Sequence, residues 1–127
     1  MWPLTAKNQL RCISSGVTPD KPIELDAEGK PAENAGSIQL NLTWTPGYGG
    51  GVEQTFSVFY GKEGNPESVI STEVECNLNR LCSLTIENLE PETTYEFYVR
   101  PKNIAGFGQT SQTLKYKTPG NYWYLIF

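Results

Sequence analysis

The side chains available for chemistry in this 127-residue chain are fourteen carboxylates and three thiols, with no histidine. The absence of histidine removes the commonest general base and the commonest metal ligand together. No glycine-rich phosphate loop leads into a helical pattern, and no Cys-x-x-Cys pair occurs. The close carboxylate pairs Glu73/Glu75 and Glu90/Glu92 fall where strands should end or turn, which is typical of solvated charge. We therefore predict that the protein is not an enzyme and uses no cofactor, metal or small-molecule substrate.

Two of the three cysteines suggest a disulfide. Cys76 and Cys82 enclose five residues, a spacing that suits a bridge across a tight strand connection if their Cβ atoms face each other. A loop this short stabilises a fold by only about 2–3 kcal/mol when the bond restricts the unfolded chain. The alternative is a pair of unpaired, half-buried thiols in a reducing compartment. Cys12 has no evident partner in the sequence.

Net charge excludes one class of partner. The 14 acidic and 10 basic side chains leave a formal charge of −4, whereas nucleic-acid binding needs a net basic footprint. The acidic excess is spread along the chain, as on an ordinary solvated surface. We therefore expect protein partners and no nucleic acid.

The elements that must position these groups are clearest in residues 84–106. Apolar and polar residues alternate there as in a strand, the alternation breaks at a Leu-Glu-Pro-Glu run, and it then resumes. In the second strand, Tyr95, Phe97 and Val99 share the core face. A tyrosine four residues after Pro91 can bury its ring and bond its hydroxyl to the backbone of the turn, which is a tyrosine corner.

These residues resemble the segment between strands E and F of a fibronectin type III domain. That family carries a Leu-x-Pro-x-Thr-x-Tyr corner followed by a strand ending in Asn-x-x-Gly. The matching residues are Leu89, Pro91, Thr93 or Thr94, Tyr95, Asn103 and Gly106. A second landmark of the family, a tryptophan that ends strand B before a Pro-Gly turn, is matched by Trp44.

One residue departs from the family pattern. Pro101 stands where the family usually carries a small residue inside strand F. Because proline cannot donate to a strand ladder, we expect the end of this strand to bend or to lie at a sheet edge.

The resemblance implies an all-β fold, a seven-stranded antiparallel immunoglobulin-like β-sandwich. We expect residues 1–18 to form an N-terminal linker or extension, residues 19–120 to form the domain, and residues 121–127 to form a short apolar tail. The tail is too short to span a bilayer, which needs about 20 residues, and its role is left open. The N-terminal stretch has no apolar segment of the length found in a secretory signal.

Within the domain, the first and last strands are the least regular. We expect a short strand at residues 23–25, then a mobile connection over the polar, Gly- and Pro-containing residues 26–36. The last strand is expected from about residue 110 to residue 118. An edge strand is expected around residues 68–74, because its glutamates suit an edge that must not aggregate.

The strand predicted at residues 38–44 carries a candidate modification site. Ile38, Leu40, Leu42 and Trp44 alternate on the core face, so Asn41 faces solvent. Asn41-Leu42-Thr43 is an N-glycosylation sequon, and we expect glycosylation of Asn41 in a secreted parent protein. The alternative is a bare, exposed asparagine.

The outward residues of three predicted strands, at about residues 55–60, 95–103 and 110–118, form a basic, partly aromatic face. Its members are Phe59, Tyr98, Arg100, Lys102, Lys115 and Lys117. We predict that this face binds an acidic protein surface, with Phe59 and Tyr98 as anchors and the cations as orienting charges. The alternative is that Phe59 and Tyr98 only stabilise the sheet as a cross-strand pair, by about 0.2–1 kcal/mol, and that the lysines only protect its edge.

The resemblance implies a non-catalytic interaction or spacer module of a cell-surface adhesion or receptor protein. The long glycine-rich loop at residues 46–54 is similar to those in immunoglobulin-superfamily adhesion proteins of the nephrin group. We therefore expect the chain to act outside the cell, secreted or at the plasma membrane, as part of a larger protein that supplies any membrane tether. The alternative is an intracellular scaffold module of the muscle type. The chain contains no Arg-Gly-Asp and no Trp-Ser-x-Trp-Ser motif, so neither integrin binding nor a cytokine-receptor variant is supported.

Overall fold

The structure is a computed structural model that describes residues 16–33, 36–76 and 81–120. Within these ranges it contains eight strands and one short 3-10 helix, η1 (Pro66–Ser68). The strands are β1 (Ile23–Pro31), β2 (Ile38–Thr45), β3 (Thr55–Lys62), β4 (Ile70–Val74), β5 (Cys82–Leu89), β6 (Thr94–Asn103), β7 (Gly106–Phe107) and β8 (Leu114–Lys117). Residues 1–15 and 121–127 lie outside the described residues, and with them the expectations for Cys12, for most of the N-terminal extension and for the apolar tail.

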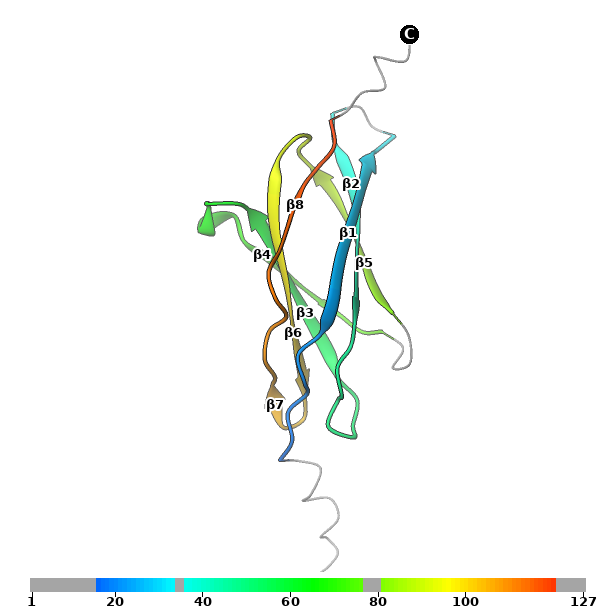
Figure 1. The fold of residues 1–127 in the computed structure, drawn as a ribbon, viewed down its shortest axis with the longest axis vertical. Helices are drawn as coiled ribbons and strands as arrows, with labels where there is room; N and C mark the ends of the chain where they lie inside the picture. The colour runs from blue at the N-terminus through cyan, green and yellow to red at the C-terminus, as the bar shows by residue number, and fades with distance from the viewer. Residues whose placement is uncertain (1–15, 34–35, 77–80, 121–127) are drawn as a thin grey trace, which may run out of the picture.

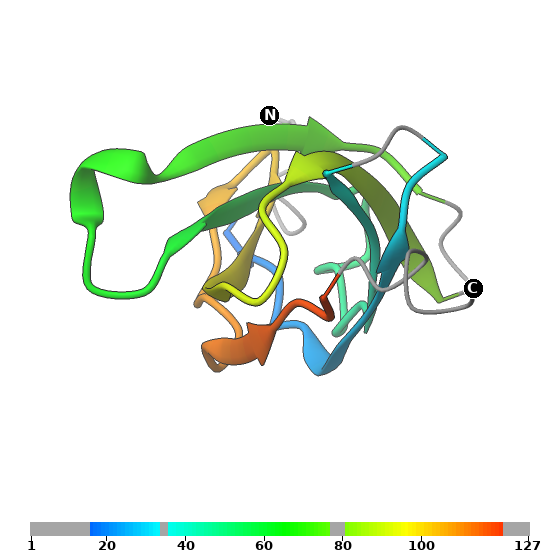
Figure 2. The same ribbon diagram turned by 90° about the horizontal axis from the view of Figure 1, so that it is seen from above.

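The strands form two antiparallel sheets that face each other (Figures 1 and 2). One sheet has the order β1-β2-β5; the other has the order β4-β3-β6, with β7 and β8 both paired to β6. The predicted all-β sandwich is confirmed. The structure has eight strands instead of seven because the last strand is divided into β7 and β8. The edge position expected for β4 is also confirmed.

The core lies between the sheets and is filled by alternate residues from the facing strands. On β2 the four predicted core residues have no exposed surface, and on β6 the same holds for Phe97 and Val99. The Trp44 and Phe56 rings meet edge to face across the two sheets, with 5.7 Å between centroids and 65° between planes. Leu89 and Tyr95 are each 5% exposed. Period-two alternation is therefore enough to select these core residues.

The first strand is longer than expected. β1 continues to Pro31 and pairs with β2 along its length, so the expectation of a mobile connection from residue 26 is wrong. Its side chains alternate between half-buried Leu25, Ala27 and Gly29 and exposed polar residues. Gly29 fits this edge because a Cβ there would come within 3.2 Å of Ile38. The inward residues are too small to produce a strong hydrophobic pattern, and pairing with β2 decides the outcome.

The division of the last strand explains how Pro101 is accommodated. β6 is an interior strand, so the expectation of a sheet edge is wrong, and Pro101 is buried opposite Phe56. Its carbonyl accepts a hydrogen bond from Gly108 N–H at 2.9 Å, so its ring nitrogen faces the same neighbouring strand. That neighbour is interrupted between β7 and β8. The missing N–H of proline therefore falls where no regular ladder exists, and the expected strand at 110–118 shortens to Leu114–Lys117.

Candidate protein-binding face

The residues predicted to bind a partner lie on the outer side of the sheet formed by β3, β6, β7 and β8. Strand register places Phe59 opposite Tyr98, Ser57 opposite Arg100, and Lys102 opposite Phe107. Their neighbours along β6 point into the core, so the two sides of this strand are chemically distinct. The outer side therefore brings together some of the six residues predicted to bind a partner.

An aromatic and cationic cluster occupies one half of this face. The Phe59 and Tyr98 rings are stacked, with 4.8 Å between centroids and 12° between planes. The guanidinium of Arg100 lies 3.9 Å from the centroid of Phe107 and 5.4 Å from that of Phe59. Lys102 Nζ lies 5.2 Å from the Phe107 centroid. We call Phe59, Tyr98, Arg100, Lys102 and Phe107 the aromatic–cation cluster.

Phe107 is the member of the cluster that sequence reasoning missed. It is 49% exposed and sits on the short β7, directly after a tight turn. Asn103 fixes that turn, because its Oδ1 accepts from Ala105 N–H at 2.8 Å. The Asn103 Nδ2 donates to the carbonyls of Val17 and Gly49, at 2.7 and 3.0 Å. A search for a hairpin around the Asn-x-x-Gly signal could have placed Phe107 beside Lys102.

The two lysines of β8 belong to a different part of the face. Lys115 Nζ lies 2.9 Å from Glu63 Oε2 and 3.8 Å from Glu96 Oε2. The hydrogen bond to Glu63 raises the pKa of Lys115, and the nearby charges of both glutamates add to the shift. Lys117 pairs with Thr94, eight residues before Lys102 on β6, which corresponds to about 26 Å along the strand. The six predicted residues therefore do not form one cluster.

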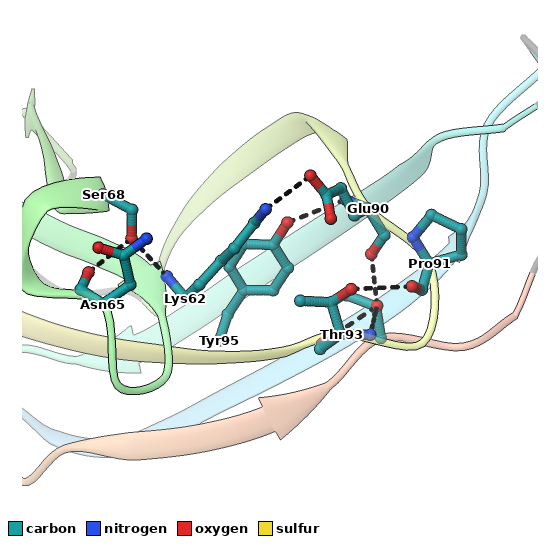
Figure 3. A network of polar contacts seen from close by, with 8 residues as sticks. Lys62, Asn65, Ser68, Glu90, Pro91, Thr93 and Tyr95 are labelled. Atoms are coloured by element: carbon teal, nitrogen blue, oxygen red, sulfur yellow. Dashed lines mark hydrogen bonds and ion pairs between the residues drawn. The ribbon is translucent and has the colours of Figure 1, made fainter.

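The tyrosine corner lies at the start of β6, where this strand follows β5 (Figure 3). The Tyr95 hydroxyl accepts a hydrogen bond from Glu90 N–H at 2.9 Å, and its ring is buried. The Thr93 hydroxyl donates to the Pro91 carbonyl at 2.9 Å. Thr118 joins the corner to the end of β8, donating its hydroxyl to the Glu90 carbonyl at 2.6 Å. These contacts hold the β5–β6 connection, so we assign this region to stability.

A second polar contact covers the corner from β3. Lys62 Nζ donates to Glu90 Oε2 at 2.6 Å, as Figure 3 shows. This hydrogen bond raises the pKa of Lys62. The two side chains are 39% and 60% exposed, and exposed ion pairs of this kind contribute about 0–1 kcal/mol.

A disulfide joins Cys76, just after β4, to Cys82 at the start of β5. The two Cα atoms are 5.6 Å apart. Because β4 and β5 belong to different sheets, the bond connects the two layers of the sandwich at one edge. Cys82 is fully buried in the core cluster, and Cys76 packs against it.

The outer side of the β1–β2–β5 sheet carries Asn41, and its residues differ in type from those of the aromatic–cation cluster on the other sheet. Asn41 is exposed, and it pairs with Glu28 on β1 and Thr85 on β5. Together with Lys30 and Gln39 these residues line a shallow polar hollow. The sheet therefore presents hydrogen-bonding groups and charges around Asn41, in place of the aromatic rings of the opposite sheet.

Among residues 16–33, 36–76 and 81–120, no group of three or more Cys, Asp or Glu side chains is arranged to hold a metal ion. Within the same residues, no helix is long and apolar enough to cross a membrane.

The sequence matches one protein family and parts of several known proteins. Residues 29–117 match the profile of the Fibronectin type III domain family. Rat Protein turtle homolog B is 32% identical over 116 residues, which is 91% of this chain and 8% of that protein. Human Netrin receptor DCC is 38% identical over 81 residues, which is 62% of this chain and 5% of that protein. The chain thus spans less than a tenth of the length of these relatives.

Solved structures show the same fold. The chicken CNTN1 FN1-FN3 domains align with a TM-score of 0.60 and 20% sequence identity, over 79% of this chain and 31% of that chain. At this level of identity the likeness concerns the fold alone.

Proposed function

The chain belongs to the fibronectin type III family, and from this premise we propose that it is a non-catalytic protein-interaction module in the extracellular part of a cell-surface adhesion or receptor protein. One relative is by name a receptor, for netrin, and the match to a small part of each relative suits a module of a longer protein. The narrower likeness to the nephrin group stays a prediction. We place the domain at residues 19–120, with residues 1–18 and 121–127 as flanking segments.

The observation that carries the interaction role is the aromatic–cation cluster. Its aromatic rings and its two cations lie on one side of a sheet whose other side is already filled by the core. The ion pairs among the described residues do not include Arg100 or Lys102. Aromatic residues and arginine are the side chains most enriched where binding energy concentrates in interfaces. We infer that the cluster binds an acidic protein surface.

The extracellular setting has support of its own. The Cys76–Cys82 disulfide suits an oxidising compartment, and the exposed Asn41 is available to a glycan. A glycan at Asn41 would cover the β1–β2–β5 sheet and leave the opposite sheet free. A free-thiol titration of the native protein tests the compartment. Reactive thiols at both Cys76 and Cys82 would favour the intracellular scaffold instead.

The interaction role is tested by substitution in the intact parent protein. Tyr98→Ala with Arg100→Ala removes one anchor and one cation, and we expect binding to partner-expressing cells to fall by at least tenfold. Glu28→Ala with Thr85→Ala, on the other sheet, is the matched control and should leave binding unchanged. Both variants are checked by circular dichroism. Full binding by a folded Tyr98/Arg100 variant would refute the role of the cluster.

A further inference from the structure

The outer side of the β4–β3–β6 sheet carries opposite charges on its two flanks. Register places Glu73 of β4 beside Ser57 of β3, and Ser57 beside Arg100 of β6. An acid and a guanidinium thus stand in one row, separated by a small side chain. Because adjacent strands lie about 4.8 Å apart, the acid and the cation are about 10 Å apart at the backbone, and no ion pair joins them.

The next row repeats this arrangement. Lys102 of β6 pairs with Thr55 of β3, and Glu75 follows β4 two residues after Glu73, on the same side of the strand. A hollow lined by Thr55, both glutamates and Lys102 lies between the two flanks. Among the described residues the ion pairs involve Lys62 and Lys115. The acidic flank and the basic flank are therefore both available for an outside partner.

We propose that the acidic surface bound by the aromatic–cation cluster is the β4 flank of a second copy of the same chain. A two-fold axis that lies in the interface and runs along β3 exchanges the β4 flank with the β6 flank. It keeps each row opposite itself, so Glu73 of one copy faces Arg100 of the other. Phe59, on the central strand, then faces its own counterpart. The inference rests on the proposed function and specifies its partner.

The size of the face sets the strength of the pairing. Residues between β3 and β4 project away from the sheet and bound the face on one side (Figure 2). The area that the two copies share, three strands wide and three rows long, is about 300 Å² per copy. Stable interfaces bury about 1,200–2,000 Å² in total, so the dimer is weak in solution. Several copies held at one cell surface raise the effective concentration and strengthen the contact.

Sedimentation velocity of the full 127-residue chain, from micromolar to millimolar concentration, tests the proposal. We expect the wild type to dimerise reversibly at the high end. An all-acidic variant, Arg100→Glu with Lys102→Glu, should associate about a hundredfold more weakly, since several weak ion pairs become repulsive. An all-basic variant, Glu73→Arg with Glu75→Lys, should behave in the same way.

Mixing the two variants tests directly whether the two flanks are complementary. The all-acidic and all-basic faces attract each other at both ends of the two-fold contact, so a one-to-one mixture should associate at least as strongly as the wild type. The matched control for the all-basic variant, Glu28→Arg with Glu87→Lys, makes the same charge change on the other sheet and should dimerise normally. Circular dichroism confirms that each variant is folded.

Three results would overturn the proposal: a wild type that stays monomeric at millimolar concentration, variants that dimerise normally, or a mixture that stays monomeric. The proposed function survives any of these results if the Tyr98/Arg100 variant still fails to bind partner-expressing cells. The acidic surface that the cluster binds then belongs to another protein. If the second copy is the partner, the charge-reversal variants lose self-association and cell binding together.

Discussion

The two sides of strand β6 differ in what they contact, although their residues alternate along the same ten positions. The inward side packs Phe97 and Val99 with no exposed surface, and the backbone beside them is hydrogen-bonded. The Val99 N–H, for example, donates to the Ser111 hydroxyl at 3.0 Å where the neighbouring strand is interrupted. The outward side holds Tyr98 and Arg100 half-exposed, with cations stacked on rings.

The difference shows how one strand can serve both folding and recognition. Burial and hydrogen bonding make each inward residue costly to change, because a cavity or an unsatisfied group remains. Outward residues gain less from the fold, because water still reaches them. The rings and charges of these outward residues are therefore accessible to a binding partner.

The largest expected effect comes from removing an inward ring. Phe97→Ala should lower the free energy of unfolding by about 3–5 kcal/mol, because the side chain is fully buried and its removal leaves a cavity. Tyr98→Ala, the adjacent outward change, should cost about 1 kcal/mol of stacking against Phe59. Urea denaturation of both variants measures the contrast. Equal losses would show that the two sides contribute alike to the fold.

Removing a single hydroxyl group from each side of β6 tests the same difference between the two sides. Tyr95→Phe leaves the Glu90 N–H without its acceptor and should lower the free energy of unfolding by about 1–2 kcal/mol. Tyr98→Phe is the control, because the Tyr98 hydroxyl has no hydrogen bond among the described residues, and stability should hardly change. The change in the midpoint of urea denaturation measures the stability of each variant. A neutral Tyr95→Phe would mean that the corner bond makes no net contribution.

A smaller effect is expected from the contact between Arg100 and Phe107. A double-mutant cycle with Arg100→Ala and Phe107→Ala should give a coupling of about 0.5–1 kcal/mol, the range for a cation over an aromatic face. The same cycle with Lys102→Ala in place of Arg100→Ala should give less, since the ammonium lies farther from the ring. A coupling of zero would reduce the cluster to independent surface side chains.

The smallest expected effect is a pH dependence at the far end of the outward side. The pKa of Lys115 is raised by Glu63 and Glu96, so its ion pairs stabilise the fold fully below the ordinary lysine pKa of about 10.4. This contribution is lost as the pH rises through the higher pKa of the folded state. Urea titrations of the wild type and Lys115→Gln across that window should differ slightly in slope. Parallel curves would contradict the shift.

Much of the fold could be predicted from the sequence because alternation fixes which residues of a strand share a face. The core positions on β2 and β6 and the Tyr95 corner follow from short-range patterns. The extent of β1 could not be predicted, because its inward residues are as small as Ala27 and Gly29 and its strand character comes from pairing with β2. The candidate site was anticipated for Phe59, Tyr98, Arg100 and Lys102, but Phe107 was missed.

The sequence by itself determined the family, the disulfide spacing and the two chemically distinct sides of β6, because each depends on residues close together in the chain. The tertiary structure decided the rest. It divided the last strand opposite Pro101, paired Lys115 with Glu63 and Glu96, and set Phe107 under Arg100. It also placed Glu73 and Arg100 on opposite flanks of one row. Phe107 follows Arg100 by only seven residues, within one hairpin. The ion pairs of Lys115 and the row of Glu73 and Arg100 join segments that are distant in sequence, and only strand register brings such segments together.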